Sequence, residues 1–169
     1  MRTWLIAVLA VGLTAWTSHA SGMDAHPADS PREVKFAPVA FQPANAATHH
    51  TIEEGGLGRL CTARGSGYFV APVQLEDGAV IQEVTVFLED DSHDSLGMMS
   101  LVRRQLERFD ILALTPVSVG TGEVETLSTT AISAPVIDNQ DATYLLQVLL
   151  SGPGVCLYGA QVRYRVPVN

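Results

Sequence analysis

The sequence predicts an all-β fold: a single antiparallel β-sandwich, jelly-roll-like, behind a signal peptide and a loose N-terminal arm. Three observations predict this class. From Gly67 onward, apolar and polar residues alternate with the period of two that half-buried strands show. Gly-rich turns separate these runs at regular spacing, and the body of the sequence shows no helix-capping signals. A chain with these features packs sheet against sheet.

The first twenty residues have the composition of a secretory signal peptide. A positive charge at Arg2 precedes an apolar run over residues 4–16, which is too short to span a bilayer, and the small residues Ser18 and Ala20 suit cleavage after position 20. We therefore expect a signal peptide at 1–20 and a mature protein that is secreted or periplasmic.

The stretch that follows the signal, residues 21–58, is rich in Pro, Ala, Ser and His, and we expect a mostly flexible arm there. Within it, residues 36–41 read Phe-Ala-Pro-Val-Ala-Phe, which suits a short edge strand because edge strands tolerate proline. The sandwich domain is then expected to occupy residues 59–169.

The strands of the body follow from local patterns in chain order. Residues 68–73 are aromatic and β-branched and end at the turn formed by residues 76–78. The next run places Val80, Val84, Val86 and Leu88 on one face. The expected strands are 68–73, 80–88, 111–119, 124–132, 144–150 and 155–166.

One segment, residues 98–109, carries two competing patterns. Its apolar residues recur at helical spacing, which taken alone indicates an amphipathic helix of about three turns. A strand instead places Met99 and Leu101 inward and Ser100 and Arg104 outward. We predict the strand, because a lone helix would have to leave a body that is otherwise all β.

The two cysteines, Cys61 and Cys156, predict a disulfide, because an oxidising compartment and an even cysteine count favour one. In the chain-entropy model a loop of this length contributes about 4–5 kcal/mol. The alternative is two separate buried thiols. Paired zinc-ligand spacing is missing, so the cysteines do not indicate a metal site.

Charge narrows the expected partners. The chain carries 10 Lys and Arg against 18 Asp and Glu, a net charge of −8, which repels phosphate backbones and argues against nucleic acid as a partner. The single lysine, Lys35, does not belong to a phosphate-binding loop. No second apolar run approaches membrane length, so we expect no membrane insertion of the mature chain.

The acidic loop, residues 89–94, is the most suggestive polar cluster. Asp90, Asp91 and Asp94 could supply oxygen ligands to calcium, although the spacing and central glycine of an EF-hand loop are missing. The alternative is a solvated turn between strands. We expect no cofactor other than this calcium ion.

A basic cluster, Arg103, Arg104 and Arg108, is the main positive feature of the body. It could pair with the acidic loop, form a solvated face, or join protomers in a homo-oligomer through exposed edge strands. Aromatic platforms for sugars are scarce, because both tryptophans lie in the signal peptide. The four tyrosines all lie in expected strands, where packing explains them: Tyr68, Tyr144, Tyr158 and Tyr164.

Several stretches together resemble a class of small exported bacterial β-sandwich proteins, jelly-roll-like and of unassigned function. They are Cys61 followed by residues 67–79, the strand end Asp90-Asp91-Ser92, Leu101 with Arg103, residues 136–139 before Tyr144, and residues 157–164. The resemblance covers about residues 36–166 and implies the fold and the exported state, without active-site residues.

These observations predict an exported, non-enzymatic binding or assembly protein of the bacterial envelope or medium, with a protein or glycan as its partner. The alternative is a glycan-binding module, or a glycan-active enzyme, that uses the acidic loop at 89–94. For that alternative, Asp91→Ala or Asp94→Ala should abolish binding or turnover. The sequence offers no catalytic constellation that would favour the enzyme.

Overall fold

The computed structural model describes residues 30–53 and 58–167; the predicted signal peptide and residues 21–29 of the predicted arm lie outside these ranges. The described residues form strands and one short 3-10 helix, η1. In chain order the elements are β1 (Arg32–Phe36), η1 (Pro38–Ala40), β2 (Gln42–Pro43), β3 (His50–Ile52), β4 (Leu60–Thr62), β5 (Ser66–Val73), β6 (Val80–Asp90), β7 (Leu96–Arg104), β8 (Phe109–Leu114), β9 (Val124–Thr129), β10 (Thr143–Ser151) and β11 (Val155–Arg165).

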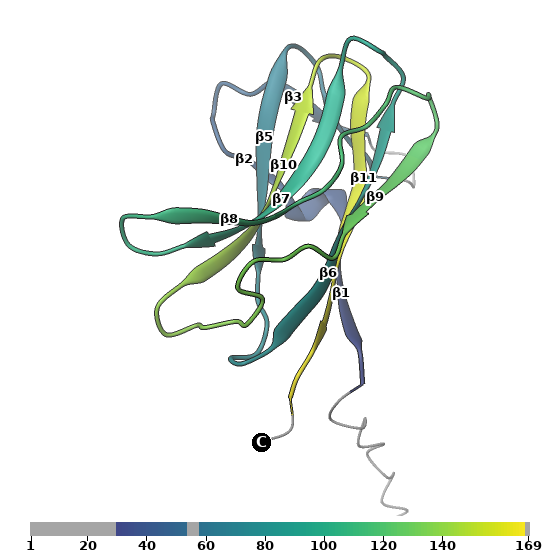
Figure 1. The fold of residues 1–169 in the computed structure, drawn as a ribbon. Helices are drawn as coiled ribbons and strands as arrows, with labels where there is room; N and C mark the ends of the chain where they lie inside the picture. Colours follow the sequence, from purple (N-terminus) through teal and green to yellow (C-terminus); the bar gives the residue numbers. More distant parts are fainter. Residues whose placement is uncertain (1–29, 54–57, 168–169) are drawn as a thin grey trace, which may run out of the picture.

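The strands form two antiparallel sheets that pack face to face (Figure 1). Sheet A has the order β3-β4-β11-β6-β9, and β1 pairs with β11 beyond the stretch that pairs with β4. Sheet B has the order β2-β5-β10-β7-β8. The predicted all-β sandwich is confirmed.

The core lies between the sheets and follows the predicted alternation. In the central strand of sheet B, β10, the inward side chains Tyr144, Leu146 and Val148 are at most 3% exposed. From sheet A, β6 contributes Val84 and Val86, both fully buried. Burying such side chains stabilises the fold by about 1.5–3 kcal/mol each.

In the segment with two competing patterns, residues 98–104 form a strand, as predicted, and residues 105–108 form a turn. In β7, Met99 and Leu101 are fully buried between the sheets, and Arg104 is exposed on the outer face. β7 pairs with β10 along its whole length. The apolar spacing that resembled a helix spans two strands: a tight turn follows β7, and Phe109, the last apolar residue of the pattern, begins β8.

The prediction of a short strand at 36–41 is wrong in its position. The strand there, β1, ends at Phe36, and Pro38 starts the 3-10 helix η1 because proline fits the first helical position. Phe36 and Phe41 then pack edge to face, with ring centroids 6.5 Å apart. Since β1, β2 and β3 pair with body strands, the sandwich begins at Arg32 rather than at residue 59.

The predicted strand at 111–119 is shorter than expected. β8 ends at Leu114, but the following residues still bond to β7 through their side chains. Thr115 Oγ1 accepts from the Met99 N–H at 2.9 Å, and Ser118 Oγ accepts from the Gly97 N–H at 2.7 Å. These hydroxyls continue the ladder where the strand geometry is lost.

The predicted disulfide joins Cys61 on β4 to Cys156 on β11, with Cα atoms 4.2 Å apart. The two cysteines are direct register partners, so the bond ties the β3–β4 pair to the middle of sheet A. Among the described residues, no helix has the length and apolar composition that crossing a membrane requires.

Candidate functional site

The outer faces of the two sheets differ in chemistry. On sheet A the outward side chains of β6, β11 and β1 are mostly polar, and several form ion pairs, such as Arg163 with Glu83 at 2.7 Å. On sheet B the outward side chains are mostly apolar. They are Tyr68, Val70 and Pro72 on β5, Leu145 and Leu149 on β10, Met98 and Val102 on β7, and Phe109, Ile111 and Leu114 on β8.

A groove of about 540 Å³ crosses the outer face of sheet B. Its floor is Val70, Leu145 and Val102, one residue from each of three adjacent strands, with Gln147 beside them. Binding sites for small ligands have about this size, an apolar lining and a few polar groups. We call this feature the sheet B groove.

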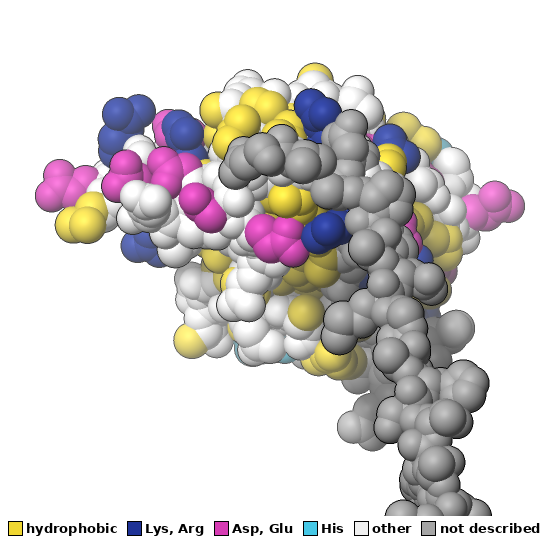
Figure 2. Space-filling view, turned by 90° about the horizontal axis from the view of Figure 1, so that it is seen from below, with side chains coloured by type: hydrophobic (Ala, Val, Ile, Leu, Met, Phe, Trp, Pro, Cys, Tyr) yellow, Lys and Arg dark blue, Asp and Glu magenta, His cyan; other side chains and the backbone are white. Residues whose placement is uncertain are grey.

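The β7–β8 hairpin forms one wall of the groove. Its two central residues, Leu106 and Glu107, are closed by backbone hydrogen bonds between Gln105 and Arg108. The hairpin projects from the side of the sandwich, and Leu106 is 99% exposed (Figure 1). Seen from below, this side of the molecule carries basic and acidic side chains close together (Figure 2). The wall is therefore charged, whereas the floor is apolar.

The basic cluster predicted from sequence lies at this wall, but its members face different ways. Arg103 points between the sheets and donates to Asp110 Oδ2 at 2.8 Å, while Arg108 lies 3.6 Å from Asp110 Oδ1. The Arg103 guanidinium holds the pKa of the Asp110 carboxyl below its usual value. Arg104 lies on the outer face and lines the groove. The cluster does not pair with the acidic loop, because the pairing partner is Asp110.

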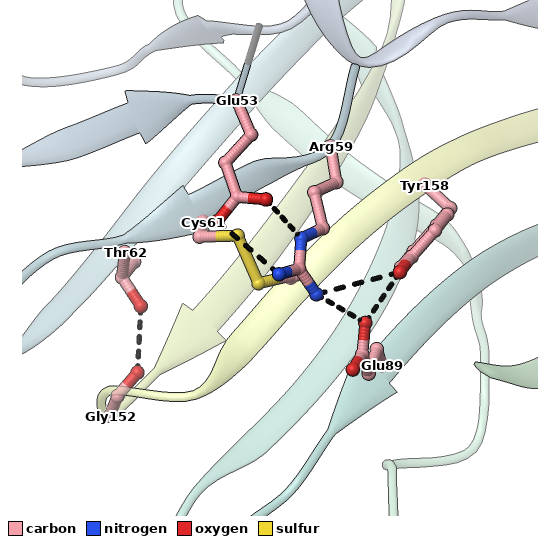
Figure 3. The surroundings of a disulfide bond; sticks show 8 residues. Glu53, Arg59, Cys61, Thr62, Glu89, Gly152 and Tyr158 are labelled. Atoms are coloured by element: carbon pink, nitrogen blue, oxygen red, sulfur yellow. Dashed lines mark hydrogen bonds and ion pairs between the residues drawn. A yellow bond between two sulfur atoms is a disulfide. The ribbon is translucent and has the colours of Figure 1, made fainter. Parts of the chain in front are cut away.

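A second polar cluster surrounds the disulfide on sheet A (Figure 3). Arg59 donates to Glu53 Oε2 at 2.7 Å and to Glu89 Oε2 at 2.6 Å, and the Tyr158 hydroxyl donates to the same Glu89 oxygen at 2.6 Å. We call these four residues the Arg59 cluster. Each charged member has its partner within the cluster, so the arrangement joins Glu53 and Arg59 to β6 and β11 of sheet A.

The pKa values in the Arg59 cluster follow from these bonds. The Tyr158 hydroxyl, with help from Arg59, lowers the pKa of the Glu89 carboxyl. The same hydrogen bond to Glu89, together with burial, raises the pKa of Tyr158. The pKa of Arg59 is raised by Glu53 and Glu89. The shifts of Glu89 and Arg59 favour their charged forms, and the shift of Tyr158 favours the protonated hydroxyl that donates to Glu89.

Asp90, one of the three predicted calcium ligands, is fully buried. Its Oδ1 accepts from Ser95 Oγ at 2.7 Å and from the Ser92 N–H at 3.2 Å, and its Oδ2 accepts from Ser118 Oγ. Asp90 therefore holds the end of β6, the β6–β7 loop and the segment after β8 together. Its carboxylate points inward, away from solvent.

The other two predicted ligands, Asp91 and Asp94, are exposed. Within the described residues, no group of three or more His, Cys, Asp or Glu side chains is arranged to hold a metal ion. Calcium at this loop therefore stays a prediction. The loop adjoins the Leu96 end of β7 and the groove adjoins the Arg104 end, about 25 Å away along the strand.

Sequence reasoning did not identify the residues of the groove floor. The signal was the run Leu145 to Leu150 in β10, where Leu145 and Leu149 make the outward face apolar as well as the inward face. In an antiparallel sheet such a two-sided apolar run indicates a second face that avoids water. The tyrosines divide accordingly: Tyr144 is 3% exposed in the core, and Tyr68 is 49% exposed on the groove face.

No protein-family model matches the sequence, and no curated protein matches it. Solved structures do match the fold. The C-terminal family 6 carbohydrate-binding module of a marine laminarinase from Zobellia galactanivorans aligns with a TM-score of 0.54 at 12% identity, covering 78% of this chain and 98% of that chain. A family 6 module from Clostridium cellulolyticum in complex with xylose aligns at 0.50 and 13%, covering 75% and 94%.

A third match is the Clostridium thermocellum xylanase 10B, in a structure of its family 22 carbohydrate-binding and family 10 hydrolase modules with xylohexaose. It aligns with a TM-score of 0.53 at 17% identity and covers 79% of this chain. The chain spans only 27% of that protein. At these identities the matches establish a shared jelly-roll sandwich and nothing about ligand.

Proposed function

We propose that this chain is a non-catalytic carbohydrate-binding module that takes a glycan chain in the sheet B groove. The groove itself carries the proposal: it crosses three strands, has an apolar floor, and places polar side chains at its edges. Sugar rings present apolar faces and hydroxyl edges, so a site of this composition matches both. The matched family 6 and family 22 modules, which include xylose and xylohexaose complexes, support the same assignment by fold.

Two side chains supply the expected contacts. Phe109 is 71% exposed at the groove wall, where its ring can stack on a sugar. Gln147 lies half-buried at the floor and offers an amide that both donates and accepts hydrogen bonds. Burying the Phe109 ring is worth about 1–2 kcal/mol, or roughly tenfold in affinity.

Chemistry at the groove favours binding over hydrolysis. Cleavage of a glycoside by the usual route requires two carboxyl groups on either side of the bond. Among the described residues that line the groove, Glu107 is the single acid. A binding role fits this lining, and the export expected from the signal peptide fits the disulfide.

Titration calorimetry with soluble polysaccharides tests the proposal, starting with xylan and laminarin. Phe109→Ala and Gln147→Ala should each weaken binding about tenfold. The matched control is Val124→Ala, a 49% exposed apolar residue on the outer face of sheet A, which should bind like wild type. Asp91→Ala and Asp94→Ala should also bind normally. Loss of binding in those two variants would move the site to the acidic loop and overturn the groove assignment.

A second candidate function is assembly, through a protein partner or a second copy of the chain. Its supporting observation is the row of exposed apolar side chains on β8 and the hairpin tip, namely Leu106, Phe109, Ile111 and Leu114. Contiguous apolar surface of this kind often marks a protein interface. Light scattering after size exclusion distinguishes the two functions, because assembly requires an oligomer or complex that Ile111→Ser disrupts.

A further inference from the structure

We propose that the sheet B groove selects an acidic glycan, a chain of hexuronate residues whose carboxylates pair with Arg104. The inference rests on the proposed carbohydrate-binding function and names its ligand class. It comes from three features of the groove: an arginine without a carboxylate partner, an exposed ring directly opposite, and the charge of the wall.

Arg104 differs from most basic residues of the sandwich. Ion pairs to carboxylates occupy Arg32, Lys35, Arg59, Arg103, Arg108 and Arg163. In the described part of the chain, the Arg104 guanidinium has neither a carboxylate nor another acceptor, although two acids, Glu107 and Asp110, lie nearby on the hairpin. Its donors therefore remain available to a ligand, and a planar guanidinium binds a carboxylate through two parallel hydrogen bonds.

Arg104 and Phe109 are direct register partners on β7 and β8, and both line the groove. Side chains in this relation have Cβ atoms about 4.5–5.5 Å apart. In a hexuronate the carboxyl group is attached directly to the sugar ring. One residue can therefore stack its ring on Phe109 while its carboxylate reaches Arg104. A neutral hexose or pentose offers only the first of these contacts.

The charges around Arg104 do not cancel this preference. Asp110, the nearest acid on β8, is already bonded to Arg103 at 2.8 Å and lies near Arg108. The groove lining holds Arg104 and Arg108 with one acid, Glu107, and the charge of Arg108 is shared with Asp110. Asp141 lines a neighbouring pocket with Arg104 and forms no ion pair with it in the described residues. The chain as a whole has a net charge of −8, so most of its surface repels an acidic ligand. The arginines at this wall instead attract it, which directs an acidic ligand to the groove.

The test uses polygalacturonic acid, its methyl ester, neutral xylan and poly-L-glutamate in titration calorimetry with the mature protein. The ester keeps the sugar and removes the charge, and polyglutamate keeps the charge and removes the sugar. We expect polygalacturonic acid to bind at least tenfold more tightly than its ester or polyglutamate. The affinity should fall with added salt, because exposed ion pairs are screened.

Arg104→Gln should reduce this preference about tenfold or more, and Arg104→Lys should retain part of it, since lysine keeps the charge without the paired donors. Arg64→Gln is the matched control. Arg64 also has no carboxylate partner in the described residues, and it lies in the β4–β5 turn at the opposite end of sheet B. Its substitution should leave binding within twofold of wild type. Thermal melts verify that each variant is folded.

The outcomes separate the two proposals. Equal binding of xylan, the ester and the acid, weakened by Phe109→Ala but not by Arg104→Gln, overturns the acidic preference and keeps the carbohydrate-binding function. Polyglutamate bound as tightly as polygalacturonic acid overturns the sugar assignment in favour of an acidic protein segment. Binding of none of the glycans removes the proposed function itself.

Discussion

Replacing Asp90 by alanine should destabilise the fold more than any other change in the acidic loop. The carboxylate is fully buried and accepts hydrogen bonds from three donors on two separate segments, Ser92 and Ser95 before β7 and Ser118 after β8. The alanine variant loses all three bonds. It also leaves the buried Ser118 hydroxyl without an acceptor, while Ser118 still accepts from the Gly97 N–H.

The expected magnitude follows from these contacts. Hydrogen bonds to a charged group contribute about 1.5–3 kcal/mol each, and part of that sum offsets the cost of burying the carboxylate. We therefore expect Asp90→Ala to lower the free energy of unfolding by about 3–5 kcal/mol. For a domain of this size, the melting temperature should fall by roughly 10–20 °C.

Urea unfolding followed by circular dichroism, in the presence of EDTA, measures this change without any contribution from calcium. Asp94→Ala is the control, because Asp94 is exposed and should shift stability by less than about 0.5 kcal/mol. Ser118→Ala should be destabilising as well, and the Asp90→Ala/Ser118→Ala double variant should lose less than the sum of the two. Additive losses, or a loss below about 1 kcal/mol for Asp90→Ala, would refute the hydrogen-bonding role assigned to Asp90.

Three further predictions follow from the site geometry. Changing Cys61 and Cys156 to serine should lower the free energy of unfolding, measured in urea, by up to about 4–5 kcal/mol. The reason is that the disulfide closes a loop with a sequence separation of 95. An unchanged free energy of unfolding would show that the disulfide does not stabilise the fold. Folding lowers the pKa of Glu89, so its stabilising contribution is present above about pH 4.3 and is lost as the pH falls through the folded pKa. Tyr158→Phe should raise that pKa, seen in an NMR titration, and flatten the acid loss of stability. Added calcium should leave the melting temperature unchanged, because Asp90 already has three donors; a concentration-dependent rise would support the calcium hypothesis.

The sequence predicted the long central strands because local alternation determines which of their side chains face the core. β10 follows this pattern along its whole length, and β6 follows it from Glu83 onward. At the start of β6 the prediction is wrong, because a register shift between Ile81 and Glu83 makes Ile81 the buried residue in place of Val80. The short strands β1, β2 and β3 escaped prediction, since two to five residues carry little periodicity and their stability comes from distant partners. β1, for example, pairs Val34 with Val162.

The burial of Asp90 was available in the sequence. Val84, Val86 and Leu88 alternate toward the core, and the next inward position of that strand is Asp90. The sequence analysis grouped Asp90 with its exposed neighbours in one loop, and so did not predict that the inward alternation of β6 extends to Asp90. The serine donors, by contrast, could not be predicted, because Ser118 reaches Asp90 only through the folded arrangement of β6, β7 and the segment after β8.

The groove was hidden for a different reason. Its floor residues, such as Leu145 and Val102, are ordinary strand residues by type, and only the register of β10 against β7 brings them side by side. Arg104 was visible as part of a basic cluster. Arg103 is paired and Arg104 is not because Asp110 lies opposite Arg103 in the β7–β8 register. The spacing of residues in the sequence does not specify this contact.

The two outer faces differ in what a ligand would have to displace. On sheet A, the members of the Arg59 cluster bond to one another beside the disulfide, so a ligand at this cluster would have to break existing bonds before making new ones. On sheet B, the floor residues Val70 and Leu145 are half-buried, Val102 is 6% exposed, and Arg104 keeps its donors. A ligand on sheet B gains contacts without losing any within the protein. This difference in what binding costs, more than the depth of the groove, supports the proposal that recognition takes place in the sheet B groove and not at the Arg59 cluster.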